Sequence, residues 1–312
     1  MGTPELSRQL AARAAALAFY SPYHFLQQFA ETDQQRLFGT GLAAGWGQLA
    51  GAEILALGEV TWLVRQLAWD SNYFETPTYK LFTGLFEAPA NAVVWAAALR
   101  QQLAQRHAAY YCFAQIPAED TALLQALTGA GWRLVETRLT YYHDQLGSFE
   151  YPPPLVRLAA PAEAAQLGRV AAAARNPYDR FHADPWYGPA TADAYLARYA
   201  ENTLAGPQLA AAVLVPDVPP AEVNAFLAVS DLREDAAALG RPLSRVLLTA
   251  VGEAQRGWHA QLVAATLLRA RALGHAAVLM TTQAPNRAVV RNAEKLGFRL
   301  GSTTHVLACH GG

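Results

Sequence analysis

The chain has very little lysine and shows no excess of charge of either sign. Its 312 residues include only two lysines, Lys80 and Lys295, and its 24 basic side chains stand against 25 acidic ones, for a formal net charge of −1. The sequence contains no basic run of the kind that binds nucleic acid or an anionic membrane surface. We therefore expect neither a nucleic-acid partner nor a membrane partner.

Cysteine and long apolar runs are also scarce. Cys112 and Cys309 are the only thiols, too few for a disulfide framework or a thiolate metal site, so we predict no metal and a reducing compartment. No stretch reaches the roughly 18 consecutive apolar residues of a membrane span. The helical pattern over residues 4–20 is interrupted by Arg8 and Arg13 and no small-residue cleavage site follows it. These features predict a cytoplasmic protein.

What the sequence does have is enough apolar residues for a large core, organised in two halves. Hydrophobic residues make up 53% of the chain, and this length suits two domains of ordinary size. The segment "GSFEYPPPL" (147–155) cannot lie within a helix or a central strand because it carries three consecutive prolines. We place the boundary there, with domains at residues 1–150 and 151–312.

The second half reads as alternating strands and helices. Residues 245–251 and 276–282 have the composition of strands, whereas 258–274 and 286–297 have helical patterns. This order predicts an α/β fold. The first half ends in the same way, with helical patterns at 91–107 and 119–131 on either side of an extended segment at 110–116.

The two halves also match residue by residue over a short window. At a separation of 166 residues, Asp120 corresponds to Asn286, Gly131 to Gly297 and Trp132 to Phe298. The apolar positions of the two intervening helical segments coincide as well. We interpret the chain as a duplicated unit.

The segment "QRGWHAQL" (255–262) has half the features of a phosphate-binding turn. Arg256 and Gly257 are present, but His259 and Gln261 stand where further glycines are expected. Backbone N–H groups at the start of a helix bind phosphate whatever the side chains are, and Gly257 lets the backbone approach the ligand. We therefore predict a working phosphate site, in which His259 is either a source of partial positive charge or an exposed first-turn residue.

Together with "NRAVVRNAEKLGFRL" (286–300), this turn resembles the acyl-CoA site of the GCN5-related N-acetyltransferase (GNAT) superfamily. The resemblance covers most of residues 155–308. It implies a GNAT fold, a mixed twisted sheet flanked by helices, in the second half. The first half is then a partial, degenerate copy, which has no Arg-Gly turn and should not bind CoA. It implies acetyl-CoA as cosubstrate, held by Ala250, Val251, Arg256, Gly257, Trp258, His259, Ala260, Gln261, Asn286 and Asn292, with a backbone N–H near Ala250 and Val251 polarising the thioester carbonyl.

One position departs from the family pattern. Many family members have a tyrosine four residues before the glycine of the Leu-Gly-Phe sequence, as the acid that protonates the CoA thiolate, and this chain has Ala293 there. Another group or water then protonates the sulfur, or the chain has lost activity.

A narrower resemblance concerns the acceptor. The segments "RFHADPWYGPATADAYLARYAENTLAG" (180–206) and "LAWDSNYF" (67–74) are similar to the dTDP-fucosamine acetyltransferases. This resemblance implies an amino group on a dTDP-linked deoxyhexose as acceptor. Aromatic planes suit the base and the sugar, and an arginine suits the diphosphate. The acceptor residues are then Arg180, Trp186, Tyr187 and Asp70, with His182 and Asp184 as candidates to receive the ammonium proton.

The sequence thus predicts an acetyl-CoA-dependent N-acetyltransferase of a nucleotide-linked amino sugar, possible as a homodimer. Two alternatives remain open at this point. One is a GNAT enzyme that acetylates another small amine. The other, indicated by Ala293 and the glycine-poor turn, is a non-catalytic acyl-CoA-binding or ligand-sensing protein.

Overall fold

The structure, a computed structural model, describes residues 4–206, 208–218 and 222–311 in two compact units. The first unit comprises Met1–Arg138 with Ser302–Gly312, and the second Leu139–Gly301. These bounds differ from a single boundary at residue 150, because two strands pass from one unit into the other. Strand β5 (Arg133–His143) begins in the first unit and ends in the second, whereas β11 (Arg299–Gly311) does the reverse.

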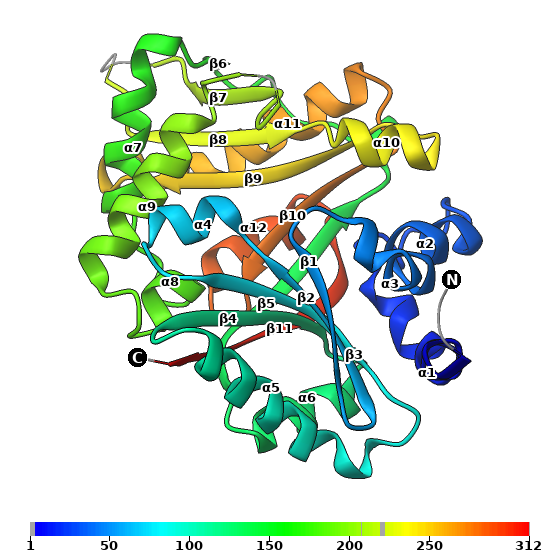
Figure 1. Cartoon of the computed structure of the whole chain (residues 1–312). Coiled ribbons are helices and arrows are strands. Elements are labelled where there is room, and N and C mark those ends of the chain that lie inside the picture. The colour runs from blue at the N-terminus through cyan, green and yellow to red at the C-terminus, as the bar shows by residue number, and fades with distance from the viewer. Residues whose placement is uncertain (1–3, 207, 219–221, 312) are drawn as a thin grey trace. The chain divides into compact units, whose positions relative to one another are not determined.

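The sheet of the first unit has the strand order β1-β2-β3-β4-β11 (Figure 1). Strands β1, β2 and β3 are antiparallel neighbours, β3 and β4 are parallel, and β11 is antiparallel to β4 from Thr304↔Pro117 to Gly311↔Tyr110. The elements of this unit besides β5 and β11 are α1 (Pro4–Leu17), α2 (Glu31–Phe38), α3 (Thr40–Ala44), β1 (Ala52–Leu57), β2 (Val60–Gln66), α4 (Ala68–Tyr73), β3 (Thr78–Leu85), α5 (Ala92–Arg106), β4 (Tyr110–Pro117) and α6 (Thr121–Gly129).

Helices cover both faces of this sheet, as the residues of β2 show. Side chains alternate between the two faces of a strand. Trp62 and Val64 pack with α5 and α6, whereas Leu63 between them packs with α1 and α3. Because both faces are buried, β2 is apolar along most of its length and lacks the alternation of a half-exposed strand.

The sheet of the second unit has the order β5-β10-β9-β8-β7-β6 (Figure 1). Strands β6, β7, β8 and β9 are antiparallel in succession, and β9 and β10 are parallel. The elements are β6 (Val156–Leu158), α7 (Ala164–Ala173), α8 (Arg180–Ala183), α9 (Pro189–Asn202), β7 (Ala212–Pro216), β8 (Ala225–Ser230), α10 (Arg233–Leu239), β9 (Leu243–Val251), α11 (Trp258–Ala272), β10 (Ala277–Gln283) and α12 (Arg287–Lys295).

This sheet is also buried on both faces. On β8, Leu227 and Val229 pack with α11 and α12, whereas Phe226 and Ala228 pack with α7 and α9. The mixed α/β architecture and the helices and strands predicted in the second half are confirmed, with ends that differ by at most two residues.

The duplication is confirmed in the local geometry. From β1 and from β7 onward, both units run strand, strand, helix, strand, helix, strand, helix, strand. Asp120 and Asn286 each begin a helix and accept a hydrogen bond from the N–H three residues later. Gly131 and Gly297 follow these helices with φ of +81° and +82°, a conformation that favours glycine.

Candidate functional site

The central feature of the second unit is a parallel strand pair that opens part of the way along. β9 and β10 are paired from Leu243↔Ala277 to Val246↔Met280, whereas β9 continues to Val251 and keeps its pairing with β8. Figure 1 shows β10 leaving β9 at an angle. Within the described residues, the edge of β9 beyond Val246 therefore faces no strand, and its backbone groups can bind another extended chain.

The opening coincides with an irregularity on the other side of β9. The pairing of β8 with β9 shifts at Leu247, between Ala228↔Leu248 and Val229↔Val246. A bulge of this kind turns the strand and re-aims its backbone. The predicted residues Ala250 and Val251 lie on the open segment, but Leu247, where the opening begins, was missed because a bulge depends on pairing that the sequence does not display.

Beyond the open segment, the chain turns into the amino end of α11. Gly257 has φ +99° and ψ −21°, and a Cβ at this position would meet no atom within 4 Å. The backbone at the turn therefore faces open space. The first N–H groups of α11 have no partner within the helix, and the dipole of this 15-residue helix favours an anion there. The structure thus places Trp258, His259, Ala260 and Gln261 in one first turn that suits a phosphate.

Arg256 stands beside this turn and is open to solvent. Its guanidinium lies 3.2 Å from a Glu253 carboxylate oxygen, and the two side chains are 80% and 93% exposed. An ion pair this exposed contributes little to stability. Arg256 is therefore able to exchange Glu253 for a phosphate at small cost.

His259 is not the exposed first-turn residue of one expectation, because this side chain is buried and neutral. It is 9% exposed, and burial lowers its pKa to about 4. The Asn292 amide donates to Nδ1 over 3.1 Å, which leaves the ring proton on Nε2. That Nε2 is buried and has no hydrogen-bond partner among the described residues.

Gln255, on the other side of Gly257, has a second buried atom of this kind. The side chain is 7% exposed, and its Oε1 has no hydrogen-bond partner within the described part of the chain. Two buried polar atoms without partners thus lie beside this turn, where a bound ligand would be able to pair with them. Sequence reasoning did not select Gln255, although its place next to Arg256 and Gly257 was a usable signal.

Ala293 lies in the core and not on an open surface. It is fully buried and packs in the apolar cluster that includes Leu296 and Phe298. A phenol at this position would need space that the packed cluster does not offer. The side chain of Asn286 is the N-cap of α12, because its Oδ1 accepts a hydrogen bond from the Val289 N–H at 3.4 Å.

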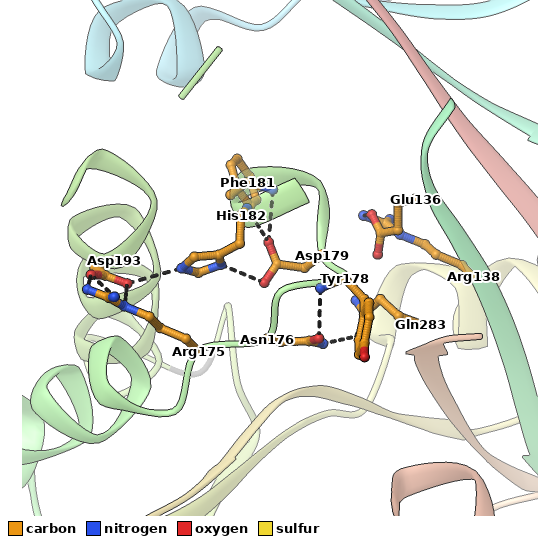
Figure 2. A network of polar contacts seen from close by, with 10 residues as sticks. All are labelled: Glu136, Arg138, Arg175, Asn176, Tyr178, Asp179, Phe181, His182, Asp193 and Gln283. Carbon is orange, nitrogen blue, oxygen red and sulfur yellow. Dashed lines mark hydrogen bonds and ion pairs between the residues drawn. The ribbon is translucent and has the colours of Figure 1, made fainter. Parts of the chain in front are cut away.

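The acceptor segment is organised around His182, which Figure 2 shows between two carboxylates. Nδ1 lies 2.8 Å from Asp179 and Nε2 lies 3.0 Å from Asp193. Although burial lowers the pKa of His182, the hydrogen bonds to Asp193 and Asp179 outweigh it and raise that pKa above its usual value. Arg175 also contacts Asp193, with Nε at 2.9 Å and 3.0 Å from its two oxygens. A ring that donates from both nitrogens has no free lone pair, so this geometry favours a positioning role over that of a base.

The other predicted acceptor residues of the second unit surround α8. Arg180 is 6% exposed and its guanidinium lies 4.4 Å from the ring centre of Phe181 and 5.9 Å from that of Tyr187. Trp186 and Tyr187 meet edge to face at 4.8 Å, and Asp184 accepts a hydrogen bond from the Trp186 N–H at 3.2 Å.

Asp70, the remaining predicted acceptor residue, belongs to the first unit. It lies in α4, where its carbonyl accepts a hydrogen bond from the Phe74 N–H. The neighbouring Trp69 is 47% exposed and stacks on Tyr73 at 5.2 Å.

The described residues contain no candidate metal cluster and no candidate membrane-spanning helix. No group of three or more His, Cys, Asp or Glu side chains there could hold a metal ion. Among the same residues, none of the helices combines the length and the apolar character that crossing a bilayer requires.

Comparison with solved structures identifies the fold. A GCN5-related N-acetyltransferase from Sphaerobacter thermophilus is similar at a TM-score of 0.56 and 13% identity, over 99% of this chain and 94% of that one. A tandem GNAT protein from the clavulanic acid biosynthesis pathway is similar at a TM-score of 0.51 and 13% identity, over 99% and 95% of the two chains. No protein-family model and no curated protein matches the sequence. The chain has the GNAT fold in a tandem arrangement.

A third similar structure aligns with almost the whole chain and is part of a larger protein. It is described as a GCN5-related glucosamine N-acetyltransferase region in a fungal multi-domain β-N-acetylglucosaminidase. The similarity has a TM-score of 0.59 at 11% identity and covers 98% of this chain and 37% of that one. At this identity the likeness concerns the fold.

Proposed function

We propose that the chain is an N-acetyltransferase that uses acetyl-CoA as cosubstrate and binds it in the second unit. The observation that carries this proposal is the opened strand pair of β9 and β10, which leads directly to the turn at Gly257. An extended thioester arm fits the free edge of β9, and a pyrophosphate fits the amino end of α11. The buried polar atoms of Gln255 and His259 add an acceptor and a donor beside the same turn.

The reaction needs little covalent participation from the protein. The acceptor amine forms a bond to the acetyl carbon, the carbon–sulfur bond of the thioester breaks, the amine loses one proton and the departing sulfur gains one. A backbone N–H on the open segment of β9, between Leu247 and Val251, donates to the carbonyl oxygen as negative charge develops there. Because Ala293 offers no acid, we propose that water protonates the sulfur, which is feasible for a thiol with a pKa of about 8.5.

For the acceptor, we propose an amino sugar carried on a nucleoside diphosphate. The support is chemical: aromatic planes at Trp186 and Tyr187 beside the guanidinium of Arg180 suit a base, a sugar and a diphosphate. The fold also occurs in a protein described as a glucosamine N-acetyltransferase region. We keep Asp184 as the proposed proton acceptor and assign His182 to hold the segment in place. The cytoplasmic location and the homodimer stay predictions.

The test is a turnover assay that follows thiol release from acetyl-CoA with a panel of amines. We expect a dTDP-linked amino sugar to react, and removal of its nucleotide to lower kcat as well as raise KM, because remote groups hold the amine in attack geometry. Arg180→Ala should raise the KM for the acceptor and leave the Kd of acetyl-CoA unchanged. Equal reaction of the free sugar or of an amino acid would refute the nucleotide-linked acceptor and leave another small amine as the substrate.

One observation favours a second candidate function, that of an acyl-CoA sensor. The fully buried Ala293 leaves the position of the usual acid without a proton donor. A sensor would bind acetyl-CoA and release no thiol with any amine of the panel.

A further inference from the structure

The first unit contains an opened strand pair that matches that of the second. β3 and β4 are paired from Thr78↔Tyr111 to Leu81↔Ala114, whereas β3 continues to Leu85 and β4 to Pro117. The pairing of β2 with β3 shifts between Leu63 and Val64, just as that of β8 with β9 does. Aligning the two parallel pairs makes Phe82 the counterpart of Leu247, the bulge residue of the second unit. Both units therefore have the same backbone opening.

Helix α1 places a charged side chain at this opening. Arg13 of α1 is 5% exposed, and its Nε donates to the Gly84 carbonyl at 3.2 Å. In the alignment of the strands Gly84 corresponds to Thr249, on the open segment of β9. The guanidinium also lies 4.5 Å from the ring centre of Phe86, which corresponds to Val251.

The other end of the guanidinium reaches Asp120, the N-cap residue of α6, which follows β4. Nη2 of Arg13 donates to a carboxylate oxygen of Asp120, and the side chains of this ion pair are 6% and 0% exposed. Asp120 caps α6 as Asn286 caps α12, because it accepts a hydrogen bond from the Leu123 N–H at 3.3 Å. Arg13 therefore bridges α6 and β3, whose counterparts in the second unit are α12 and β9, the strand that carries the open edge of the proposed acyl-CoA site.

Tyr20, which follows α1, completes the contact. Its hydroxyl donates to the same Asp120 oxygen at 2.7 Å and accepts from the Thr83 hydroxyl at 3.2 Å. Burial and the neighbouring charge of Asp120 raise the pKa of Tyr20 well above its usual value, so the hydroxyl keeps its proton. The Asp120 carboxylate thus accepts hydrogen bonds from three donors, and Leu17 of α1 belongs to the same apolar cluster as Leu85.

We propose that α1 acts as a tethered occupant of the first unit's opened strand pair, with Arg13 in the place that a thioester arm takes in the second unit. The chain then binds one acyl-CoA, and the first unit has its opening filled by its own helix. The inference rests on the proposed function for the identity of the second unit's ligand. The occupation of the first unit by α1 stands on the contacts of Arg13 and Tyr20.

The test uses hydrogen exchange of the full chain with acetyl-CoA and, separately, acetyl-pantetheine, which needs no phosphate turn. In the wild type we expect one acetyl-CoA per chain by calorimetry. Neither ligand should slow exchange at residues 82–86. Protection of that segment in the wild type, or faster exchange of α1 on ligand addition, would show that α1 does not close the opening.

The decisive variant is R13A/D120N, which removes both charges together and gives the first unit the asparagine of the second. Removing Arg13 alone would leave a buried carboxylate without a positive charge beside it, which is strongly destabilising. In the double variant, acetyl-pantetheine should slow exchange at residues 82–86 at least fivefold. The matched control is R8A, because Arg8 lies on the same helix and pairs with Glu87 at 3.1 Å in solvent. R8A should behave as the wild type.

The outcomes separate this inference from the proposed function. Absence of protection at 82–86 in a double variant that keeps the wild-type circular dichroism overturns the role of α1. If the double variant does not fold, the role of α1 is decided in the wild type, by the calorimetric stoichiometry and by the exchange at residues 82–86. Failure of the wild type to bind acetyl-CoA at residues 252–261 instead overturns the proposed function and leaves the result at residues 82–86 interpretable.

Discussion

Replacing Gly257 with alanine tests the proposed phosphate turn directly. At φ +99° an alanine is strained, and because its Cβ would meet no atom within 4 Å, the cost comes from the backbone alone. Left-handed backbone costs a non-glycine residue about 1–2 kcal/mol. The turn relieves this strain by rotating, and its N–H groups then no longer converge on the phosphate. Losing one charge-assisted hydrogen bond of about 1.5–3 kcal/mol weakens acetyl-CoA binding by roughly 10-fold to 100-fold.

The same helix offers a matched control at its other end. Gly274 follows α11 with φ +70°, and a Cβ there would also meet no atom within 4 Å. Gly274→Ala should therefore cost the unliganded protein about as much stability as Gly257→Ala, roughly 1–2 kcal/mol or a few degrees in Tm. It should leave acetyl-CoA affinity unchanged.

The assay is thermal unfolding with and without acetyl-CoA, supported by calorimetric titration. At 100 times the wild-type Kd, the ligand should stabilise the wild type and Gly274→Ala by about 2.7 kcal/mol. At the same concentration it should stabilise Gly257→Ala by only about 0.4–1.4 kcal/mol. Equal loss of affinity in the two variants, or none in Gly257→Ala, would refute the assignment of this turn to the phosphate.

Three further predictions follow from the burial and the charge states of single side chains. Ala293→Tyr should destabilise the protein by about 1–3 kcal/mol through overpacking, without raising kcat. Denaturant unfolding and the turnover assay measure these two effects, and a faster enzyme of unchanged stability would contradict the prediction. Because the folded-state pKa of His182 is raised, its contribution to stability is fully present below the unfolded pKa of about 6.5 and is lost as pH rises through the folded value. The stability difference between wild type and His182→Asn should shrink from pH 5.5 to 8.5, and a difference that grows would count against the two-carboxylate geometry. For His259 the sign is opposite: with a folded pKa of about 4, the unfolded chain takes up the proton first, so stability falls as pH drops from about 6.5 to 4. His259→Gln should flatten that part of the wild-type profile, and an unchanged slope would contradict the burial of a neutral ring.

Local sequence signals were sufficient for the elements around the turn. Gly257 indicated a turn in which the backbone approaches a ligand, and the patterns of residues 258–274 and 286–297 predicted helices. Asp120 and Asn286 predicted helix starts, and the interval of 166 residues between them revealed the duplication. These features depend on residues close together in the chain, and so the sequence contains them.

What the sequence could not supply depends on contacts between distant segments. His259 has an ordinary polar side chain in the sequence, and only the packing of α11 against α12 made it a buried, neutral donor. His182 looked like a base until Asp179 and Asp193 were found at its two nitrogens. The bulge at Leu247 depends on the register between two strands, which the pattern of a single strand does not specify.

Periodicity, helix ends and turn glycines are local properties, and from them the sequence predicts a duplicated α/β protein with one Arg-Gly turn. The folded structure was needed to see which polar groups are buried and that Arg13 reaches Asp120 across 107 residues of chain. A contact of that kind depends on how several elements pack together. The residues of α1, taken alone, indicated no more than an amphipathic helix.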